Sequence, residues 1–145
     1  MSVSLVGVCC QPSSVPADKE LWINKMDPLL SHITTSWEGA IIMLDTNINT
    51  RNNNSQVTTR YIQTLNNHGL QQHIDQPTRN GNKIIDHIAS NLDHILAKIV
   101  LPCNEISDHD VPYVIIDIRK QRFVPRFKYI TRENNIDISA FKRDI

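Results

Sequence analysis

Two short, nearly continuous apolar runs constrain the fold of this chain more than any other feature. Residues 3–10 read VSLVGVCC and residues 40–44 read AIIML. Apolar runs of this length, with β-branched residues among them, predict strands rather than helices. We expect the first run to be a buried strand. The second run predicts a central strand buried on both faces, inside a sheet that lies between two other layers.

The segments that follow these runs have the periodicity of helices. Between residues 19 and 33 most apolar side chains recur at intervals of three and four, which predicts one buried helical face. Asp18 can cap this helix at its start. Pro28 is expected to kink the helix or to split it in two. Residues 57–70 predict a second amphipathic helix with Gly69 as its C-terminal cap.

More strands follow the second helix. A short strand and a turn are expected between residues 71 and 83, then a strand that begins at Ile84 and strands over residues 97–102 and 111–120. This order predicts an α/β domain, layered as an α+β sandwich, with acidic residues at the ends of its inner strands. We expect the domain to span residues 1–119, followed by a linker or tail over residues 120–145.

The composition allows a packed core and says little about partners. Apolar residues make up 40% of the chain, and 15 basic residues balance 15 acidic ones, so the net charge neither indicates nor excludes a nucleic-acid partner. No apolar run is long enough to cross a bilayer, and no secretory signal is evident. Cys9, Cys10 and Cys103 match no zinc pattern, which predicts reduced and mostly buried thiols in an intracellular protein.

Asp45 is the first candidate for a functional site. It stands where the run at residues 40–44 ends, and layered folds place their sites at the ends of buried strands. The structural alternative is that Asp45 only begins a turn, because Asp and Asn form turns through their own side chains. Spacing alone favours the turn.

Asp86 and His109 form a second candidate pair. Ile84, Ile85 and Ile88 surround Asp86, so its carboxylate is expected to be partly buried and to need a partner. His87 must point to the opposite face of a strand. His109 is therefore the natural partner, because a carboxylate fixes the tautomer and charge of an imidazole. A salt link between Asp86 and a Lys or Arg is the alternative.

Asp108, His109 and Asp110 stand side by side before the last strand. Carboxylates bind Mg²⁺ well, and an imidazole can donate a proton or contact a phosphate oxygen. The string SDH is short enough to occur by chance. The other histidines are expected on helix faces or in loops, without chemistry; they are His32, His68, His73 and His94.

The motifs LDTN, QPTR, IIDHI and SDH, in this order, resemble the second half of the endonuclease/exonuclease/phosphatase superfamily. The likeness is greatest to endonuclease domains of non-LTR retrotransposons, which read roughly G-D-F-N, P-T-R, I-D-H-I and S-D-H. It covers about residues 3–119. The resemblance implies the C-terminal portion of a four-layered fold, hydrolysis of DNA phosphodiesters with Mg²⁺ or Mn²⁺, and an intracellular location that includes the nucleus.

The same resemblance implies roles for seven side chains. Asp45 would hold the attacking water and take its proton, and Asn47 would donate to the scissile phosphate or orient that water. Asp86 would orient His109, which would contact the phosphate and stabilise its growing charge. Asp108 would help to bind the metal. The DNA-facing loop would contain Thr78 and Arg79.

The chain also departs from the family pattern. LDTN replaces G-D-F-N, and the family's active-site Tyr and Arg fall on Cys10 and Gln11. The family's first half, with an early Asn and a metal-binding Glu, has no counterpart before Met1. We therefore expect a truncated domain that is weak or inactive alone, with one sheet face exposed.

Two other functions stay open. One is a non-catalytic module that binds nucleic acid through Arg79, Lys83 and the basic, aromatic stretch at residues 119–128, although a solvated linker is the simpler reading of that stretch. The other keeps the family and replaces DNA by a phosphoinositide or another phosphodiester. The PTR-like motif and the tail favour DNA. The sequence gives no indication of the oligomeric state.

Overall fold

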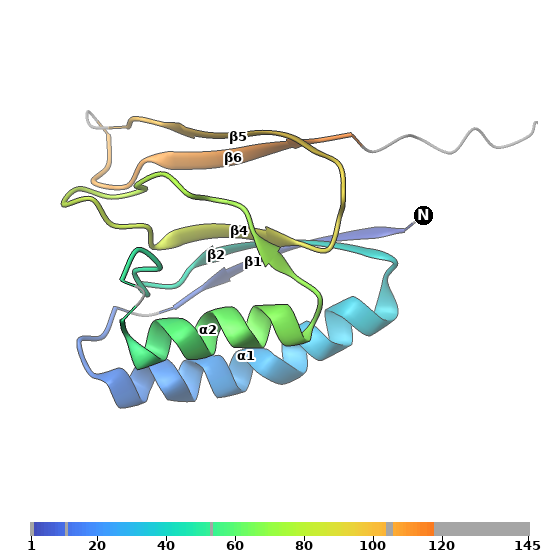
Figure 1. Ribbon diagram of the computed structural model, residues 1–145, viewed down its shortest axis with the longest axis horizontal. Helices are drawn as coiled ribbons and strands as arrows, with labels where there is room; N and C mark the ends of the chain where they lie inside the picture. Colours follow the sequence, from blue (N-terminus) through green and yellow to red (C-terminus); the bar gives the residue numbers. More distant parts are fainter. Residues whose placement is uncertain (1, 11, 53, 104–105, 118–145) are drawn as a thin grey trace, which may run out of the picture.

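A mixed α and β architecture with two helices and two sheets is described by the computed structural model for residues 2–10, 12–52, 54–103 and 106–117 (Figure 1). The expected linker at residues 120–145 lies outside the described residues. The elements, in chain order, are β1 (Val3–Cys9), α1 (Pro16–Ser36), β2 (Gly39–Asp45), α2 (Gln56–Asn67), β3 (Gln71–Gln72), β4 (Asp86–Ser90), β5 (Ile95–Leu101) and β6 (Val111–Ile116).

The elements form three layers. A four-stranded sheet in the order β1-β2-β4-β3 lies in the middle, with α1 and α2 on one face and the β5–β6 hairpin over the other (Figure 1). β1 runs parallel to β2, whereas β4 runs antiparallel to both β2 and β3. The expected α+β class is confirmed at this level. In the described part of the chain, neither helix has the length and apolar character that crossing a membrane requires.

The core has two parts that lie on opposite faces of the sheet. The larger cluster joins the helices to β2 and β4 and includes Ile23, Leu30, Ile42 and Tyr61. The smaller cluster consists of Ile74, Ile84 and Ile88, with side chains of β5 and β6 packed against it. Burial of apolar side chains on both faces therefore fixes the position of β4 between the helices and the hairpin.

The hairpin leaves part of the sheet uncovered. It packs over β4, while Met43 on β2 stays 43% exposed and Leu5 on β1 stays 65% exposed. The expectation that residues 40–44 are buried on both faces is therefore wrong for Met43, and β1 is buried only on its helix side. An apolar run predicts that a strand forms, but the neighbouring layers decide which of its side chains are covered.

Helix α1 differs from the expectation in its N-cap residue and in the effect of Pro28. Val15 is its N-cap residue, with Pro16 at the first helical position, and Asp18 instead lies in the first turn. Proline is well suited to this position because the first N–H groups of a helix have no intrahelical partner. The helix is not split at Pro28, which lies inside the element. Four buried apolar residues on one side of α1 hold it against the sheet.

Helix α2 and the start of β4 agree more closely with the sequence. Ser55 caps α2 by accepting a hydrogen bond from the backbone of Thr58. Gly69 follows the helix in a left-handed conformation with φ of 68°, as a C-terminal glycine should. The ladder of β4 begins at Asp86 rather than Ile84, because the backbone of Ile84 and Ile85 bonds to the segments at residues 46–50 and to Thr78.

Candidate functional site at the ends of β2 and β4

Three neighbouring strands place polar side chains on one face at the same end of the sheet. Cys9 is paired with Asp45 in the parallel β1–β2 ladder, and Asp45 is paired with Asp86 in the antiparallel β2–β4 ladder. Residues directly opposite each other in neighbouring strands point to the same face. A thiol and two carboxylates therefore form a row across the sheet, on the side away from the helices.

His109 approaches this row from the segment before β6. Its Nδ1 lies 3.0 Å from both carboxylate oxygens of Asp86, as expected from the sequence. The side chains of Asp86 and His109 are 16% and 27% exposed, so solvent can reach the pair only in part. A carboxylate in this position fixes the ring orientation, and the other ring nitrogen, Nε2, lies 4.0 Å from Asp108 Oδ1.

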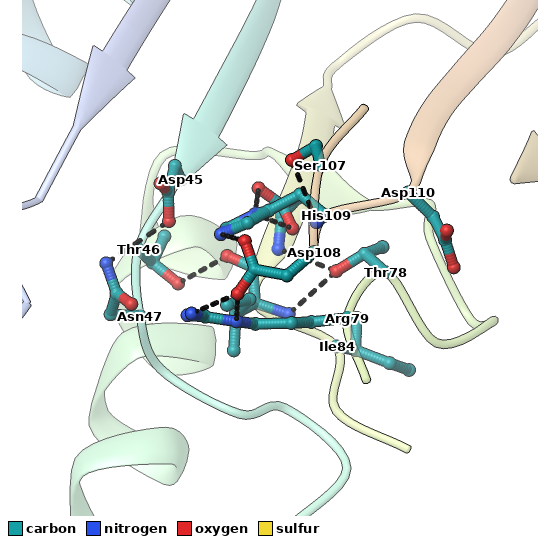
Figure 2. A network of polar contacts seen from close by, with 12 residues as sticks. Asp45, Thr46, Asn47, Thr78, Arg79, Ile84, Ser107, Asp108, His109 and Asp110 are labelled. Carbon is teal, nitrogen blue, oxygen red and sulfur yellow. Dashed lines mark hydrogen bonds and ion pairs between the residues drawn. The ribbon is translucent and has the colours of Figure 1, made fainter. Parts of the chain in front are cut away.

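Backbone contacts hold His109 in place. Its N–H donates to Ser107 Oγ at 3.0 Å, and an isolated bridge joins it to Arg79 (Figure 2). The next residue, Asp110, donates its N–H to the carbonyl of Thr78, and its carboxylate accepts from the N–H of Cys103. Asp110 thus connects the loop that contains Thr78 with the segment at Cys103, which follows β5. The bridge to Arg79 and these bonds together fix the backbone that carries the imidazole.

Asp45, Asp86 and His109 could together hold a metal ion. One ligand atom from each of them can be chosen so that all three lie within 4.8 Å of one another. Carboxylate oxygens and imidazole nitrogens are ligands for divalent cations such as Zn²⁺, Mn²⁺ and Mg²⁺. The three side chains come from β2, β4 and the segment before β6, so the cluster exists only in the folded chain. No feature of this cluster by itself selects Mg²⁺.

Asn47 lies beside Asp45 in a left-handed backbone conformation, with φ of 51° (Figure 2). Its amide Nδ2 donates to Asp45 Oδ1 at 3.3 Å and to the carbonyl of Cys10 at 3.0 Å. The Lys19 ammonium donates to the Asn47 carbonyl at 2.8 Å. Contacts from α1 and from the residue that follows β1 therefore stabilise a conformation that few non-glycine residues adopt, and they hold the amide next to the Asp45 carboxylate.

Thr78 stabilises the site from the interior of the protein. It is completely buried, and its hydroxyl accepts hydrogen bonds from the N–H groups of Ile85 and Asp86, both at 3.1 Å. These two N–H groups lie at the start of β4, where Thr78 takes the place of a ladder partner. Thr78 therefore fixes the backbone of Asp86 through this hydrogen bond. Direct contact between Thr78 and a substrate stays a prediction.

Arg79 and Asp108 pair with each other at the outer side of the site (Figure 2). The guanidinium donates to Asp108 Oδ2 from Nε at 2.9 Å and from a terminal nitrogen at 2.5 Å. These hydrogen bonds lower the pKa of Asp108. Asp108 is not among the donors of the three-residue cluster described above. A role for Asp108 in metal binding and a role for Arg79 in substrate binding stay predictions.

His87 lies on the helix side of β4, as the alternation of a strand predicts. Its ring stacks on Tyr61 of α2 with centroids 5.2 Å apart, and its Nδ1 lies 2.9 Å from the tyrosine hydroxyl. Thr46 and Thr50 also contact the ring nitrogens. Burial lowers the pKa of His87 to about 4 and raises the pKa of Tyr61. The neutral ring therefore fastens α2 beneath the carboxylate row.

A hollow of about 410 Å³ adjoins the row on the uncovered part of the sheet. Cys9, Asp45 and Asp86 line one part of it, and Met43 and Pro112 give it an apolar wall. A substrate or ion in this hollow would reach the carboxylates from the side of the sheet that the hairpin leaves open.

Sequence reasoning brought Asp45, Asn47, Asp86 and His109 to this end of the sheet but missed Cys9. Cys9 is exposed, contrary to the expectation that the thiols are mostly buried, whereas Cys10 is buried. The sequence contained a signal: Cys9 lies near the end of the apolar run at residues 3–10, and Asp45 directly follows the run at residues 40–44. Only the parallel pairing of these two strands makes them neighbours.

Comparisons of this chain with protein-family models, with curated proteins and with solved structures found no match. The fold and the site by themselves define the class of this protein. It is a layered α+β protein with a cluster of two carboxylates and one histidine that could hold a metal ion.

Proposed function

We propose that this chain belongs to the endonuclease/exonuclease/phosphatase superfamily and catalyses divalent-metal-dependent hydrolysis of phosphodiester bonds in DNA. The observation that carries the proposal is the convergence of Asp45, Asp86 and His109, from three separate motifs, at one end of the sheet. The proposal is also supported by the three layers of helices, sheet and hairpin, which correspond to part of the layered fold expected for that superfamily. Within the superfamily, we propose that this chain derives from the endonuclease domain of a non-LTR retrotransposon.

The residues of the site have complementary chemical properties. Asp45 accepts a proton from the attacking water, while the Asn47 amide next to it orients that water or donates to the phosphate. Asp86 positions the imidazole of His109, whose Nε2 contacts the phosphate as its negative charge grows. A divalent cation, Mg²⁺ or Mn²⁺, would supply Lewis-acid stabilisation of the phosphoryl oxygens when bound.

Cationic loops beside the site support DNA as the substrate. Arg79 and Lys83 form an isolated backbone bridge, and the Arg51 guanidinium donates to the side chain of Asn82 between them. Arg51 and Lys83 are exposed. Positive side chains on loops next to the reacting group are suited to the phosphates that flank a cleavage point, and such contacts position a duplex without reading its sequence.

Nicking of supercoiled plasmid in Mg²⁺ or Mn²⁺ tests the proposal. We expect slow, metal-dependent nicking that falls by about a hundredfold or more in Asp45→Asn and in His109→Gln, because general acid–base groups contribute at least this much. His32→Gln, an exposed change on α1, is the matched control and should retain the wild-type rate.

Nicking that persists without a divalent metal, or that is equal in Asp45→Asn and wild type, would contradict the proposal. DNA binding that weakens with salt, persists in Asp45→Asn and His109→Gln, and comes without nicking would instead support the non-catalytic nucleic-acid-binding function.

A further inference from the structure

The outer edge of β1 is a surface that the carboxylate and histidine cluster does not use. β1 stands first in the sheet order β1-β2-β4-β3, so within the described part of the chain no strand lies beside its second edge. We propose that this edge pairs with the same edge of a second copy of the chain, antiparallel and about a two-fold axis at Val6. The two four-stranded sheets then form one continuous sheet.

Backbone hydrogen bonds at both ends of β1 define which of its groups face the open edge. The Ser2 carbonyl accepts from the Gly39 N–H at 3.0 Å, and the Cys10 N–H donates to the Asp45 carbonyl at 2.7 Å. The N–H and C=O of one strand residue point to the same side, and this direction alternates along the strand. Even-numbered residues therefore bond to β2. The odd-numbered residues direct their N–H and C=O groups outward; they are Val3, Leu5, Gly7 and Cys9.

β1 lacks the features by which natural edge strands avoid pairing with another chain. Residues Val3–Cys9 include no charged residue and no proline, and no bulge interrupts their register with β2. Lysine, proline and bulges are common ways in which natural proteins protect an exposed edge. An uncharged strand can pair with an identical strand because no like charges meet across the axis. The chemistry of this edge therefore fits a second copy of the same chain.

One register brings all the outward groups of both strands together. It places Val3 opposite Cys9 of the second copy and Leu5 opposite its Gly7, and each such pair exchanges two hydrogen bonds. A shift by two residues would leave groups at one end unpaired. Leu5 is 65% exposed, and a β-carbon on Gly7 would meet no atom within 4 Å. The leucine therefore has room to lie over the glycine of the other copy.

The pairing determines how the two candidate sites are arranged. Val6 lies opposite its own copy, and both side chains face the helices, so the two-fold axis is perpendicular to the sheet. Both carboxylate rows therefore open on the same face of the joined sheet. The two Cys9 residues are about 20 Å apart along the strands. The dimer carries two sites on one surface, and neither copy contributes a side chain to the site of the other.

Sedimentation equilibrium of the purified chain, from about 1 µM to about 1 mM, tests this inference. We expect the wild type to show a monomer–dimer equilibrium. Leu5→Lys should weaken dimerisation about tenfold or more, because it removes apolar burial and places two ammonium groups diagonally across the axis. Leu96→Lys, at a leucine of β5 that is 66% exposed, is the matched control and should dimerise like the wild type. Circular dichroism checks that both variants fold.

Disulfide cross-linking tests the register. Val6→Cys places a thiol opposite its own copy in a non-hydrogen-bonded pair, where the α-carbons lie about 4.5 Å apart, within the range of a disulfide. Val8→Cys, on the same face of β1, lies opposite Ser4 of the second copy and is the control. Both variants are made together with Cys9→Ser, because Cys9 is exposed. Under mild oxidation we expect a covalent dimer in Val6→Cys and none in Val8→Cys.

The inference is overturned if the wild type stays monomeric up to about 1 mM, if Leu5→Lys dimerises as well as the wild type, or if Val8→Cys cross-links as readily as Val6→Cys. A dimer that Ile115→Lys abolishes and Leu5→Lys preserves would place the interface on the hairpin instead, and it would also overturn the inference. These results are independent of the nicking experiment, which tests the proposed hydrolysis.

Discussion

Asp45 and Asp86 face each other directly across the β2–β4 ladder, so that two carboxylates lie on one face of adjacent strands. Like charges at directly opposed positions destabilise a sheet. Natural cross-strand pairs usually avoid this arrangement, and here it lies at the position where the chain gathers its other metal-ligating groups. We therefore expect this arrangement to reduce the stability of the fold by a measurable amount.

Asp45→Asn is expected to stabilise the fold. The substitution removes one of the two facing charges and keeps a side-chain oxygen that can accept from Asn47. The expected gain in the free energy of unfolding is about 0.2–1 kcal/mol at low ionic strength and smaller at high salt. Urea denaturation at two salt concentrations measures it. Asp93→Asn, at an exposed loop position, is the control, and an equal gain there would contradict the explanation.

Stability is expected to fall as the pH is lowered from about 6.5 to about 4. Burial lowers the pKa of His87 to about 4 from 6.5, so in this range the unfolded chain binds a proton that the folded chain does not. The folded state therefore loses about 3 kcal/mol over the window, with the full stability present above it. Urea unfolding at several pH values measures the slope.

The slope should decrease in His87→Gln, because this variant lacks the buried imidazole. Part of it should remain in His87→Gln, since burial and the nearby Lys98 also lower the pKa of His73. A wild-type stability that does not change between pH 6.5 and 4 would show that the folded chain accommodates a charged His87.

Arg79→Gln is expected to raise the pKa of Asp108 toward its ordinary value. The hydrogen bonds from the Arg79 guanidinium are the main cause of the lowered pKa, and a neutral amide cannot replace their charge. Carbon-detected NMR titration of the carboxyl groups measures the effect. Lys83→Gln removes a charge on the same loop and should leave Asp108 nearly unchanged. Equal shifts in both variants would indicate a general field rather than this pair.

Gly69→Ala is expected to destabilise the chain by about 1 kcal/mol, because φ at this position is 68° and a β-carbon disfavours that conformation. A β-carbon would meet no atom within 4 Å, so the backbone alone causes the loss. Gly7→Ala in β1 is the matched control. It also meets nothing within 4 Å and should be neutral or slightly stabilising. Thermal unfolding of both variants tests the contrast.

The local features of the fold were predictable from the sequence. The alternation of a strand placed Asp86 and His87 on opposite faces, and Gly69 marked the end of α2. These features depend on residues that are close together in the chain. Helix and strand periodicity and the φ preference of glycine are local properties, and a single sequence displays them directly.

The non-local features were not predictable. The sequence does not state that β1 pairs with β2, so the position of Cys9 beside Asp45 was missed. It also does not state that the hairpin covers β4 and leaves Met43 exposed. The pairing of Arg79 with Asp108 joins two segments that are 29 residues apart. Each of these contacts depends on how whole layers pack, which local patterns leave undetermined.

The register of β1, β2 and β4 has a consequence for how this chain can vary in length. Insertion or deletion of one residue inside β2 would turn Asp45 toward the helices and separate it from both neighbours, because side chains alternate with a period of two. A change in the connection between β4 and β5 would leave the three strand ends untouched. Natural versions of this chain are therefore expected to tolerate insertions and deletions in the connection between β4 and β5 and to lack them within β1, β2 and β4.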